Sequence, residues 1–345
     1  MSEPTIAAVV VNHNYARYVS SAVESVLAQD VPFDEVFVVD DGSTDDSRTV
    51  LARYRDRVTV LEILNRGQLG ACRAALAEAT ADYVYFLDAD DEAFPHLVRT
   101  VTPALATHPV KVQFQLQGIS EGAGELHSVF PSFPDGYDAT AARADNDTLG
   151  VYICPPTSGN VYRREALLEL PLDRIDQRDF IDGPTTFALP YVGEIVSVDA
   201  PLAYYRLHGD NHSQWSEPTV ELLRHEVDWF HRRWSQVGVL LDGPDPRPGG
   251  RPMYEAEREL MITALRPRGL PVLGAVRMIR AMLRTNLPPR QKVLLTGWAL
   301  ALCLPSARLR NQLVRARRSP LNRSGSLRRI VRLGVRGRRS DALAS

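Results

Sequence analysis

The N-terminal part of the chain alternates four times between runs of β-forming residues and segments with helical periodicity. The β-forming runs cover residues 6–11, 36–40, 58–63 and 83–87. In the segments that follow them, apolar residues recur every three or four positions, which is typical of helices that pack on a core. Strands joined by helices pair in parallel through right-handed crossovers, so the alternation predicts an α/β fold with a mostly parallel central sheet flanked by helices.

Acidic residues gather where two of these strands end. Asp40 and Asp41 close the second strand, and Asp88, Asp90 and Asp91 follow the fourth. In open α/β sheets, ligands bind at the carboxyl ends of parallel strands. Five carboxylates at that edge would repel one another and any phosphate unless a divalent cation lay among them, and aspartate oxygens suit Mg²⁺ or Mn²⁺. The sequence therefore predicts a metal–diphosphate site, although each group alone also fits a plain turn or a solvated loop.

The second helix has a predicted start. Ser43 or Thr44 is expected to cap it, because hydroxyl side chains satisfy the free N–H groups of a first turn. Asp45 and Asp46 would then lie in that first turn, where acidic side chains complement the helix dipole.

After the alternating part, the pattern becomes mixed. Apolar residues alternate with glutamines over 112–117, and a second run covers 126–130 after a glycine-rich turn, which predicts a half-exposed hairpin. Residues 131–150 are rich in turn-forming residues and are expected to be mostly loop. Residues 220–237 carry an apolar stripe at helical spacing, and the proline- and glycine-rich segment 241–252 is typical of a linker.

The C-terminal part of the chain differs from the rest in charge. Residues 246–345 hold 22 lysine and arginine residues against 4 aspartate and glutamate residues, whereas residues 1–245 hold 18 against 38. Helical segments are expected over residues 253–265, 271–284, 290–304 and 306–318. The uncharged stretch 293–304 is too short to cross a bilayer, which takes about 20 residues.

The arginines that follow this stretch are Arg308, Arg310, Arg315, Arg317 and Arg318. An apolar helix with a basic continuation fits the interface of an anionic membrane. A helical region with a solvated basic face, or a homodimer surface, is the alternative. Three widely spaced cysteines and a start without a basic signal-peptide region indicate a cytoplasmic protein, either free or peripherally attached to the cytoplasmic face of a membrane.

Four motifs, in order, carry a resemblance to a known family. They are VVVNHNY at 9–15, VDDGSTD at 39–45, NRGQLGACR at 65–73 and FLDADD at 86–91. Over residues 5–110, and more weakly to about 215, the chain resembles the family 2-type glycosyltransferases, which have the Rossmann-like GT-A fold. The resemblance does not cover residues 245–345.

This resemblance implies a domain organisation. We expect a GT-A domain over residues 1–240, with a nucleotide-binding half over about 1–110 and an acceptor half over about 111–240. A linker over 241–252 would then lead to a basic C-terminal helical extension over 253–345.

The resemblance also implies an activity. It is a metal-dependent, inverting transfer of one sugar from a nucleotide sugar, usually a UDP-sugar, to a hydroxyl of a carbohydrate or lipid-linked acceptor. Such reactions serve cell-envelope or extracellular polysaccharide and glycoconjugate assembly, with Mg²⁺ or Mn²⁺ as the cofactor. No nucleic-acid partner is expected. The Gln-x-x-Arg-Trp signature of processive synthases is absent. The alternative function is a non-catalytic nucleotide-sugar-binding or scaffold protein.

Individual roles follow from the same resemblance. The residues expected to contact the nucleotide or donor are Asn12, Asn14, Tyr15, Asp40, Asp41, Arg73, Asp88 and Arg206. Those expected at the metal are Asp90, Asp88 and His208. Arg206 and His208 alternate around Leu207, so both could face the diphosphate, and a surface position on the third helix is the alternative for Arg73.

An inverting reaction needs a base on the face opposite the leaving group. The resemblance assigns this role to Asp182, and Asp179 is the alternative because Ile181 replaces the acidic neighbour that the base usually has. The segment TSGN at 157–160 resembles the acceptor-side loop that precedes this base.

Two other enzyme classes fit less well. A nicotinamide-dependent oxidoreductase would carry Gly-x-Gly-x-x-Gly after the first strand, and a nucleotidyltransferase would carry a glycine-rich loop with a basic residue there. This chain has Asn12-His13-Asn14-Tyr15 at that position. Neither class is therefore favoured.

Overall fold

The computed structural model describes residues 3–120, 124–208, 217–247, 250–266, 269 and 271–318. The chain divides into two compact units. The first comprises the described residues of Met1–Asp147, Val151–Gly209 and Arg232–Pro248. The second comprises those of Thr148–Gly150, Asp210–His231 and Gly249–Ser345. The domain limits expected from the sequence stay a prediction.

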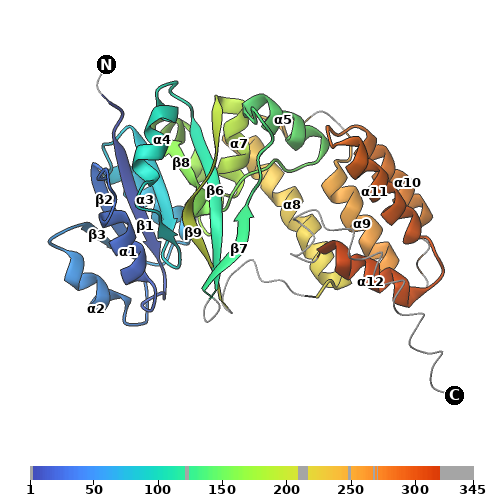
Figure 1. Cartoon of the computed structure of the whole chain (residues 1–345), viewed down its shortest axis with the longest axis horizontal. Helices are drawn as coiled ribbons and strands as arrows, with labels where there is room; N and C mark the ends of the chain where they lie inside the picture. The colour runs from blue at the N-terminus through green and yellow to red at the C-terminus, as the bar shows by residue number, and fades with distance from the viewer. Residues whose placement is uncertain are drawn as a thin grey trace. The chain divides into compact units, whose positions relative to one another are not determined.

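A parallel four-stranded region forms one side of the sheet in the first unit (Figure 1). Its strands are β1 (Ile6–Asn12), β2 (Glu35–Asp41), β3 (Thr59–Ile63) and β4 (Tyr83–Asp88). They lie in the order β3–β2–β1–β4, and each neighbouring pair is parallel. The α/β fold with a mostly parallel sheet on the nucleotide-binding side is thus confirmed.

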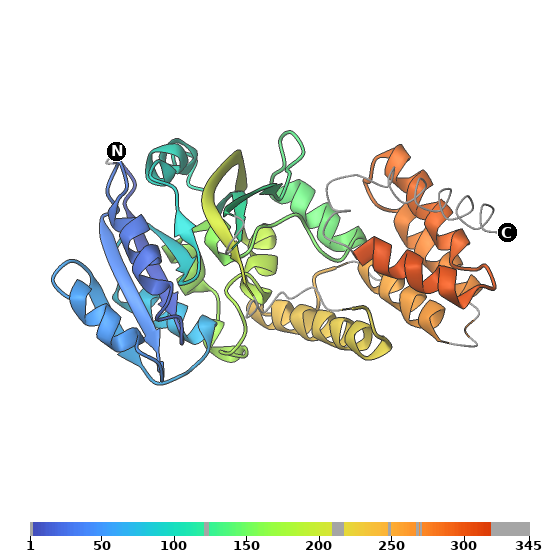
Figure 2. The ribbon, with the colours of Figure 1, turned by 60° about the horizontal axis from the view of Figure 1, so that its bottom comes forward.

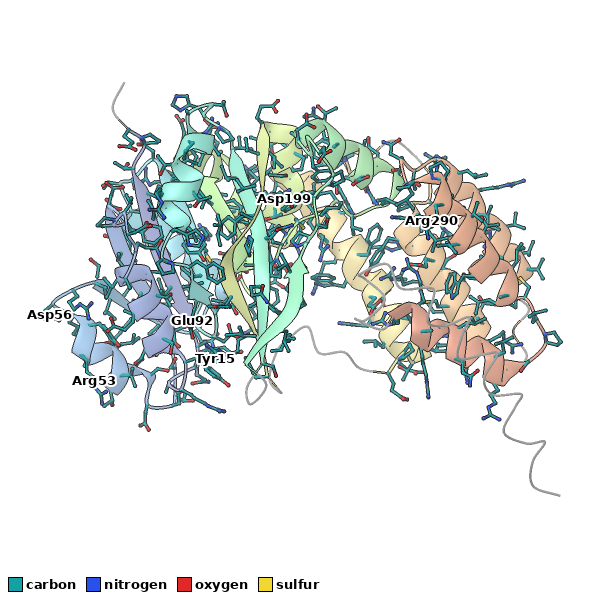
Figure 3. The ribbon with its side chains drawn as sticks, viewed as in Figure 1. Tyr15, Arg53, Asp56, Glu92, Asp199 and Arg290 are labelled. Carbon is teal, nitrogen blue, oxygen red and sulfur yellow. The ribbon has the colours of Figure 1, made fainter. Side chains whose placement is uncertain are left out.

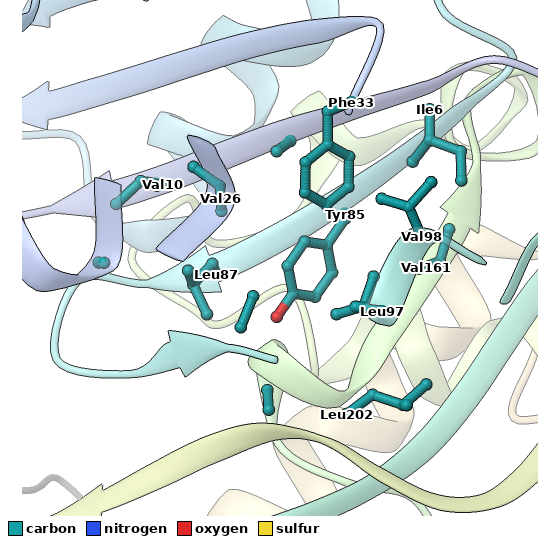
Figure 4. Packing of buried hydrophobic residues seen from close by; sticks show 14 of the residues in the cluster. Ile6, Val10, Val26, Phe33, Tyr85, Leu87, Leu97, Val98, Val161 and Leu202 are labelled. Carbon is teal, nitrogen blue, oxygen red and sulfur yellow. The ribbon is translucent and has the colours of Figure 1, made fainter. Parts of the chain in front are cut away.

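Helices cover both faces of this region. They are α1 (Val19–Leu27), α2 (Ser47–Leu51), the 3₁₀ turn η1 (Ala52–Tyr54), α3 (Gln68–Glu78) and α4 (Leu97–Leu105), and the short strand β5 (Glu92–Ala93) precedes α4. Ile6 and Val10 of β1 share a core cluster with Val26 of α1 and Leu97 of α4, and Figure 4 shows this packing. The alternate β1 side chains are equally buried, where α3 contacts the strand. A strand covered on both faces accounts for the uninterrupted apolar run.

The rest of the sheet is mixed. Its strands are β6 (Lys111–Ser120), β7 (Gly124–Phe130), β8 (Asn160–Arg163) and β9 (Ile195–Leu207). Strand β8 pairs antiparallel with both β4 and β6, whereas β9 runs parallel to β6 and antiparallel to β5. Strand β9 therefore lies beside β5, the short strand that follows β4, although the two are far apart in the sequence.

The β6–β7 hairpin is confirmed, but the expectation that it is half-exposed is wrong at its base. Gln113 of β6 is fully buried, and its Nε2 donates to Ser197 Oγ (2.9 Å) and to the Ile153 carbonyl (3.2 Å). The segment that carries Ile153 packs over this side chain, and Ser197 lies on the neighbouring strand β9. A glutamine can occupy such a position only because its amide finds partners.

Two further expectations are corrected. The segment 131–150 contains helix α5 (Ala139–Thr148) rather than loop alone. Helix α2 begins at Ser47, later than expected, so neither Ser43 nor Thr44 caps it. Instead, Ser43 Oγ and the Thr44 N–H bond to Asn14, which ties this turn to the end of β1.

The remaining helices of the first unit follow α5 in the chain. They are α6 (Arg164–Glu169) and α7 (Pro184–Val192), with the 3₁₀ turns η2 (Thr157–Gly159) and η3 (Leu172–Arg174). Helix α8 (Val220–Leu240) gives residues to both units. In Figure 2, α7 lies beside the mixed strands of the same unit.

The described residues of the second unit are helical. Besides the start of α8, they form α9 (Met253–Leu265), α10 (Val272–Leu283), α11 (Pro289–Ala301) and α12 (Ala307–Arg318). Leu260, Met278, Trp298 and Val314 lie in their shared core. None of the described helices has both the length and the apolar composition that a bilayer crossing demands. The rest of the arginine-rich end, residues 319–345, lies outside the described residues.

Candidate active site

The parallel strands end together at one edge of the sheet. Asn12 of β1 lies opposite Asp40 of β2, and Val11 lies opposite Asp88 of β4. Tyr15 and Glu92, which follow β1 and β4, both appear at this lower edge in Figure 3. The strand register therefore brings both groups of acidic residues to the same side of the sheet, where open α/β sheets bind their ligands.

The first acidic pair is surrounded by hydrogen-bond donors from the protein. Asp40 is fully buried and accepts from Asn12 Nδ2 (2.9 Å), the Ser43 N–H (3.3 Å) and Arg48 Nε (3.3 Å). The Asp41 carboxylate accepts from two backbone N–H groups, those of Arg66 (2.7 Å) and Gly67 (2.8 Å). Each carboxylate is thus held by donors that stabilise its charged form.

The turn after β1 is built around Asn14. Its φ of 59° is in the left-handed region, which asparagine tolerates better than most residues. Asn14 Oδ1 accepts from the Thr44 N–H (2.7 Å), and its Nδ2 faces His13 Nε2 (3.1 Å). His13 Nε2 is therefore an acceptor, and His13 Nδ1 donates to the Asp41 carbonyl (2.8 Å). The three expected nucleotide-contacting positions Asn12, Asn14 and Tyr15 all lie at this edge.

The second acidic group is different, because its carboxylates face one another. Asp88, Asp90 and Asp91 each offer an oxygen within 4.8 Å of the others. Burial, followed by the charges of Asp90 and Asp182, raises the pKa of Asp88 well above its usual range. Burial, followed by the charges of Asp90 and Asp88, raises the pKa of Asp91 in the same way. Among the described residues, the buried Asp91 Oδ2 has no hydrogen-bond partner.

Strand β9 and the residue after it bring Arg206 and His208 to this acidic group. His208 Nε2 lies 2.9 Å from Asp90 Oδ2. Arg206 donates through its backbone N–H to Asp91 Oδ1 (2.8 Å) and through Nε to the Asp90 carbonyl (2.8 Å), and it pairs with Glu92. Arg206 therefore holds the turn that carries the aspartates. Residues 209–216, which follow His208, lie outside the described residues.

An aromatic side chain that sequence analysis missed supports this pair. The ring of Tyr18 stacks on His208 with 5.2 Å between centroids, and the Arg206 guanidinium lies 5.3 Å from the centre of the same ring. Tyr15 contacts His208 edge-on at 5.8 Å. The sequence signal was weak, since Tyr18 lies outside the four motifs.

Gln68 joins the acidic group to the candidate base, and sequence analysis missed it. Its Nε2 donates to Asp88 Oδ1 (2.6 Å) and Thr157 Oγ1 (3.1 Å), and its Oε1 accepts from the Ile181 N–H (3.0 Å). The Asp88 N–H also donates to Ser158 Oγ (3.1 Å). The TSGN segment and the loop before Asp182 are thereby fixed against the end of β4.

Burial dominates the environment of Asp182. It raises the pKa of this carboxyl to about 6, while Arg233 lowers the value and Asp179 raises it further. Asp179 is more engaged, because it accepts from Gln236 Nε2 (3.2 Å) and from the Phe180 N–H (3.2 Å). Of the two candidate bases, Asp182 is the one whose charge also acts on Asp88.

Arg73 bonds to a neutral side chain in the structure. It lies half-buried on α3, and its Nη1 donates to Gln177 Oε1 (2.6 Å). This bond joins α3 to the loop before Asp179. The side chain that accepts from Arg73 is thus neutral, and the expected position near a diphosphate stays a prediction.

The acidic group fits a hard divalent cation. Its donor set consists of carboxylate oxygens, which Mg²⁺ and Mn²⁺ prefer, with an imidazole nitrogen at Asp90. The unpartnered Asp91 Oδ2 is the kind of buried atom that needs a positive partner. Burial, followed by the charge of Asp90, raises the pKa of both Asp88 and Asp91, and a bound cation would offset both effects.

Comparison with known proteins agrees with this site. The model of the family described as "Glycosyl transferase family 2" matches residues 7–170. An uncharacterized glycosyltransferase of a Nostoc species is 35% identical over 236 residues, which are 63% of this chain and 69% of that protein. The putative teichuronic acid biosynthesis glycosyltransferase TuaG of Bacillus subtilis is 36% identical over 94 residues, 26% of this chain and 37% of TuaG.

A solved structure shows the same fold. Residues 1–349 of Staphylococcus aureus TarS, in complex with UDP-GlcNAc, superpose with a TM-score of 0.52 at 18% sequence identity, covering 91% of each chain. This likeness concerns the arrangement of strands and helices alone, because the sequence identity is low. Together with the family match and the Nostoc relative, it shows that the chain belongs to family 2 of the glycosyltransferases and has the GT-A fold.

Proposed function

We propose that this enzyme transfers one sugar, with inversion, from a nucleotide sugar to an acceptor hydroxyl, and that the reaction depends on a divalent cation. A UDP-sugar is the proposed donor. The observation that carries the proposal is the bridge through Gln68, which joins the uncompensated carboxylate Asp88 to the loop of Asp182. In a single displacement, the leaving diphosphate and the base that accepts the proton must both lie next to the sugar, so the residues that hold them must be near each other.

The donor side would use the end of the parallel sheet. Asp88, Asp90, Asp91 and His208 would hold Mg²⁺ or Mn²⁺, which would neutralise the diphosphate oxygens and the charge that develops as the nucleoside diphosphate leaves. Arg206 keeps these aspartates in place through its bonds to the same turn.

The nucleoside would lie against the ends of β1 and β2. Asn12 Oδ1 is buried and has no hydrogen-bond partner within the described part of the chain, so it can accept from a base N–H. Asp41 has lone pairs beyond those used by its two backbone donors, so it can also accept from a base N–H or a ribose hydroxyl.

Asp182 would act as the base. Its pKa of about 6 leaves the carboxylate ionised at neutral pH, yet basic enough to take a proton from an acceptor hydroxyl. The acceptor oxygen would then bond to the anomeric carbon as the bond to the diphosphate breaks on the opposite face. Asp179 is the weaker candidate because Gln236 and a backbone N–H already occupy its oxygens.

The acceptor is proposed to be a carbohydrate or lipid-linked intermediate of a cell-envelope or extracellular polymer. The similarity to TuaG, named for teichuronic acid biosynthesis, and to TarS, named as a poly(ribitol-phosphate) β-N-acetylglucosaminyltransferase, supports this class. A cytoplasmic location belongs to the same proposal, because nucleotide sugars are supplied there.

The test is a donor screen on the full chain. Thermal shift is measured with UDP- and GDP-sugars, each with and without Mn²⁺, followed by release of the nucleoside diphosphate. We expect one sugar class to stabilise the fold only when Mn²⁺ is present, by mass action. Asp182→Asn should keep that shift but lose turnover, and Asp56→Asn, which changes an exposed aspartate of the same unit, should keep both. A shift with every donor that is indifferent to Mn²⁺ would contradict the proposal.

A further inference from the structure

Exposed aliphatic side chains concentrate on two helices of the second unit. Among the described residues, thirteen large hydrophobic side chains are exposed, and eight of them lie between residues 272 and 304. The most exposed are Leu273 of α10 and Val293 of α11, both at 71%, and Leu283 at 62%. Helices α10 and α11 are neighbours (Figures 1 and 2). A contiguous apolar face of this kind marks an interaction surface more often than chance exposure.

The exposed side of α10 is divided between apolar and basic residues. At about 100° per residue, Val272, Val276 and Leu283 fall within about 40° of the helix circumference. The exposed residues Arg277, Arg280 and Arg284 occupy the adjoining arc of about 60°, which also contains the exposed Leu273. Aliphatic and basic side chains side by side on one exposed face are typical of a helix that lies in a membrane interface.

The arginines of α10 also line a cavity. This cavity is open to solvent and has a volume of about 390 Å³, and its lining consists of Arg251, Arg277, Arg280, Ala281 and Arg284. Arg251 is paired with Glu255 (3.1 Å) and with Glu259. Within the part of the chain that the structure describes, the three arginines of α10 have no acidic partner. Arginines three and four residues apart on one helix repel each other, so an anion in this cavity would relieve that repulsion.

The arginines of α12, which the sequence suggested for membrane contact, are placed differently. Arg315 pairs with Glu217 (3.1 Å), Arg317 with Glu257 (2.7 Å) and Arg318 with Glu226 (2.6 Å). Arg310 is buried and donates to backbone carbonyls, including that of Ala264 (2.9 Å). The fold therefore pairs three arginines of α12 with glutamates and buries a fourth, whereas the described residues offer no acidic partner to the arginines of α10.

We propose that the outer face of α10 and α11 docks on an anionic phospholipid surface. The aliphatic side chains would enter the boundary of the acyl chains, and the arginine cavity would hold a lipid phosphate. Charge complementarity favours this occupant over a second copy of the chain, because a two-fold interface made by this face would bring the arginines of α10 against each other. The proposal does not depend on the transferase activity.

The test is vesicle co-sedimentation of the full chain. Phosphatidylcholine vesicles are compared with vesicles that also contain phosphatidylglycerol, at low and at high salt. We expect binding to the anionic vesicles only, and we expect salt to weaken it. Arg277→Gln/Arg280→Gln/Arg284→Gln should lower the partition coefficient on the order of 10²-fold, because each basic residue near such a surface contributes about one factor of five. Leu273→Ser/Leu283→Ser should lower it by at least about tenfold.

Matched controls test whether position matters. Arg53→Gln/Arg55→Gln/Arg57→Gln removes the same charge from exposed positions of the first unit, and Leu168→Ser removes an exposed leucine there. Both should bind vesicles as the unaltered chain does, with circular dichroism confirming that every variant folds. Equal loss in the control and the α10 arginine variant would overturn the proposal, because net charge alone would then account for binding.

Other occupants give other results. If the α10 arginines were needed to bind inorganic pyrophosphate but not vesicles, the cavity would serve a soluble phosphate and the lipid proposal would be wrong. If Leu273→Ser/Leu283→Ser turned a dimer into a monomer in analytical ultracentrifugation and left vesicle binding unchanged, a second copy would be the occupant.

Discussion

Two acidic groups lie at the same edge of the sheet, and the protein treats them in opposite ways. Asp40 and Asp41 are surrounded by donors, including two backbone N–H groups and Arg48. Asp88, Asp90 and Asp91 face one another, and among the described residues one buried oxygen of Asp91 has no hydrogen-bond partner. The first group has a donor from the protein for each carboxylate and needs no cation. The second receives some donors, yet three carboxylates remain close together with one buried oxygen unbonded, which is why we place the cation there.

The largest expected effect distinguishes the two groups by activity. Asp90→Asn removes one ligand and one negative charge from the uncompensated group. We expect turnover to fall by about 10²–10³-fold, the usual cost of losing one element of charge stabilisation in a transition state. Thermal stability without metal should stay the same or rise, because the remaining carboxylates repel less. Full Mn²⁺-dependent turnover in this variant would show that Asp90 does not take part in binding the cation.

The opposite pattern is expected for the compensated group. Asp41→Asn keeps one acceptor oxygen but sets an amide NH₂ against a backbone N–H of Arg66 or Gly67. A buried donor left unpaired costs about 1–3 kcal/mol. We expect denaturant unfolding to show a loss of this size without metal, measured against Asp56→Asn. If Asp41→Asn were as stable as the unaltered chain and Asp90→Asn were less stable, the claim that only the first acidic pair is stabilised by the fold would be wrong.

The pH dependence of turnover and of stability tests the role of Asp182, which lies near the second acidic group. Asp182 must be ionised to accept a proton, so turnover should fall about tenfold per pH unit below its pKa of about 6. Because folding raises this pKa, the folded state binds more protons than the unfolded chain between about pH 4 and 6. The contribution of Asp182 to stability therefore decreases as pH rises through that window.

Asp182→Asn should accordingly have a higher melting temperature than the unaltered chain at pH 7, and the difference should vanish near pH 4. Calorimetry across this range measures it. A melting temperature that is lowered at pH 7 would indicate a structural ion pair with Arg233 rather than a poised base.

The smallest expected effect concerns Gln68, whose side chain joins Asp88 to the loop that carries Asp182. Gln68→Met removes the bonds to Asp88 and Ile181, and we expect kcat to fall about tenfold with an unchanged KM for the donor. Gln115→Met is the matched control, because it removes a glutamine–aspartate bond of the same length, 2.6 Å, to Asp199. Asp199 lies away from Tyr15 and Glu92 in Figure 3. Equal effects of the two substitutions would deny Gln68 a positioning role.

The parallel part of the fold could be predicted because its signals are local. An uninterrupted apolar run such as that of β1 is typical of a strand covered on both faces, and the helices after it carry clear periodicity. The buried Gln113 could not be predicted, since its burial depends on β8 and β9, which pair with β6 from distant parts of the chain. Helix α5 was missed because its sequence consists largely of turn-forming and small residues.

The candidate site divides in the same way. The motifs indicated Asp88, Asp90 and His208, and the structure brings these three side chains together. Gln68 was missed because its bond to Ile181 joins residues far apart in the sequence, and no single-sequence pattern reveals such a contact. The different surroundings of Asp40 and Asp91 could not be predicted either, because both are aspartates at or near the end of a strand.

Anomalous scattering from crystals grown with Mn²⁺ and UDP tests the central claim most directly. We predict one strong manganese peak within coordination distance of Asp90 and Asp91, bridging to the UDP diphosphate, with Asp91 Oδ2 no longer unpartnered. A manganese peak at Asp40 and Asp41, or bound UDP with no peak at either acidic group, would contradict the claim.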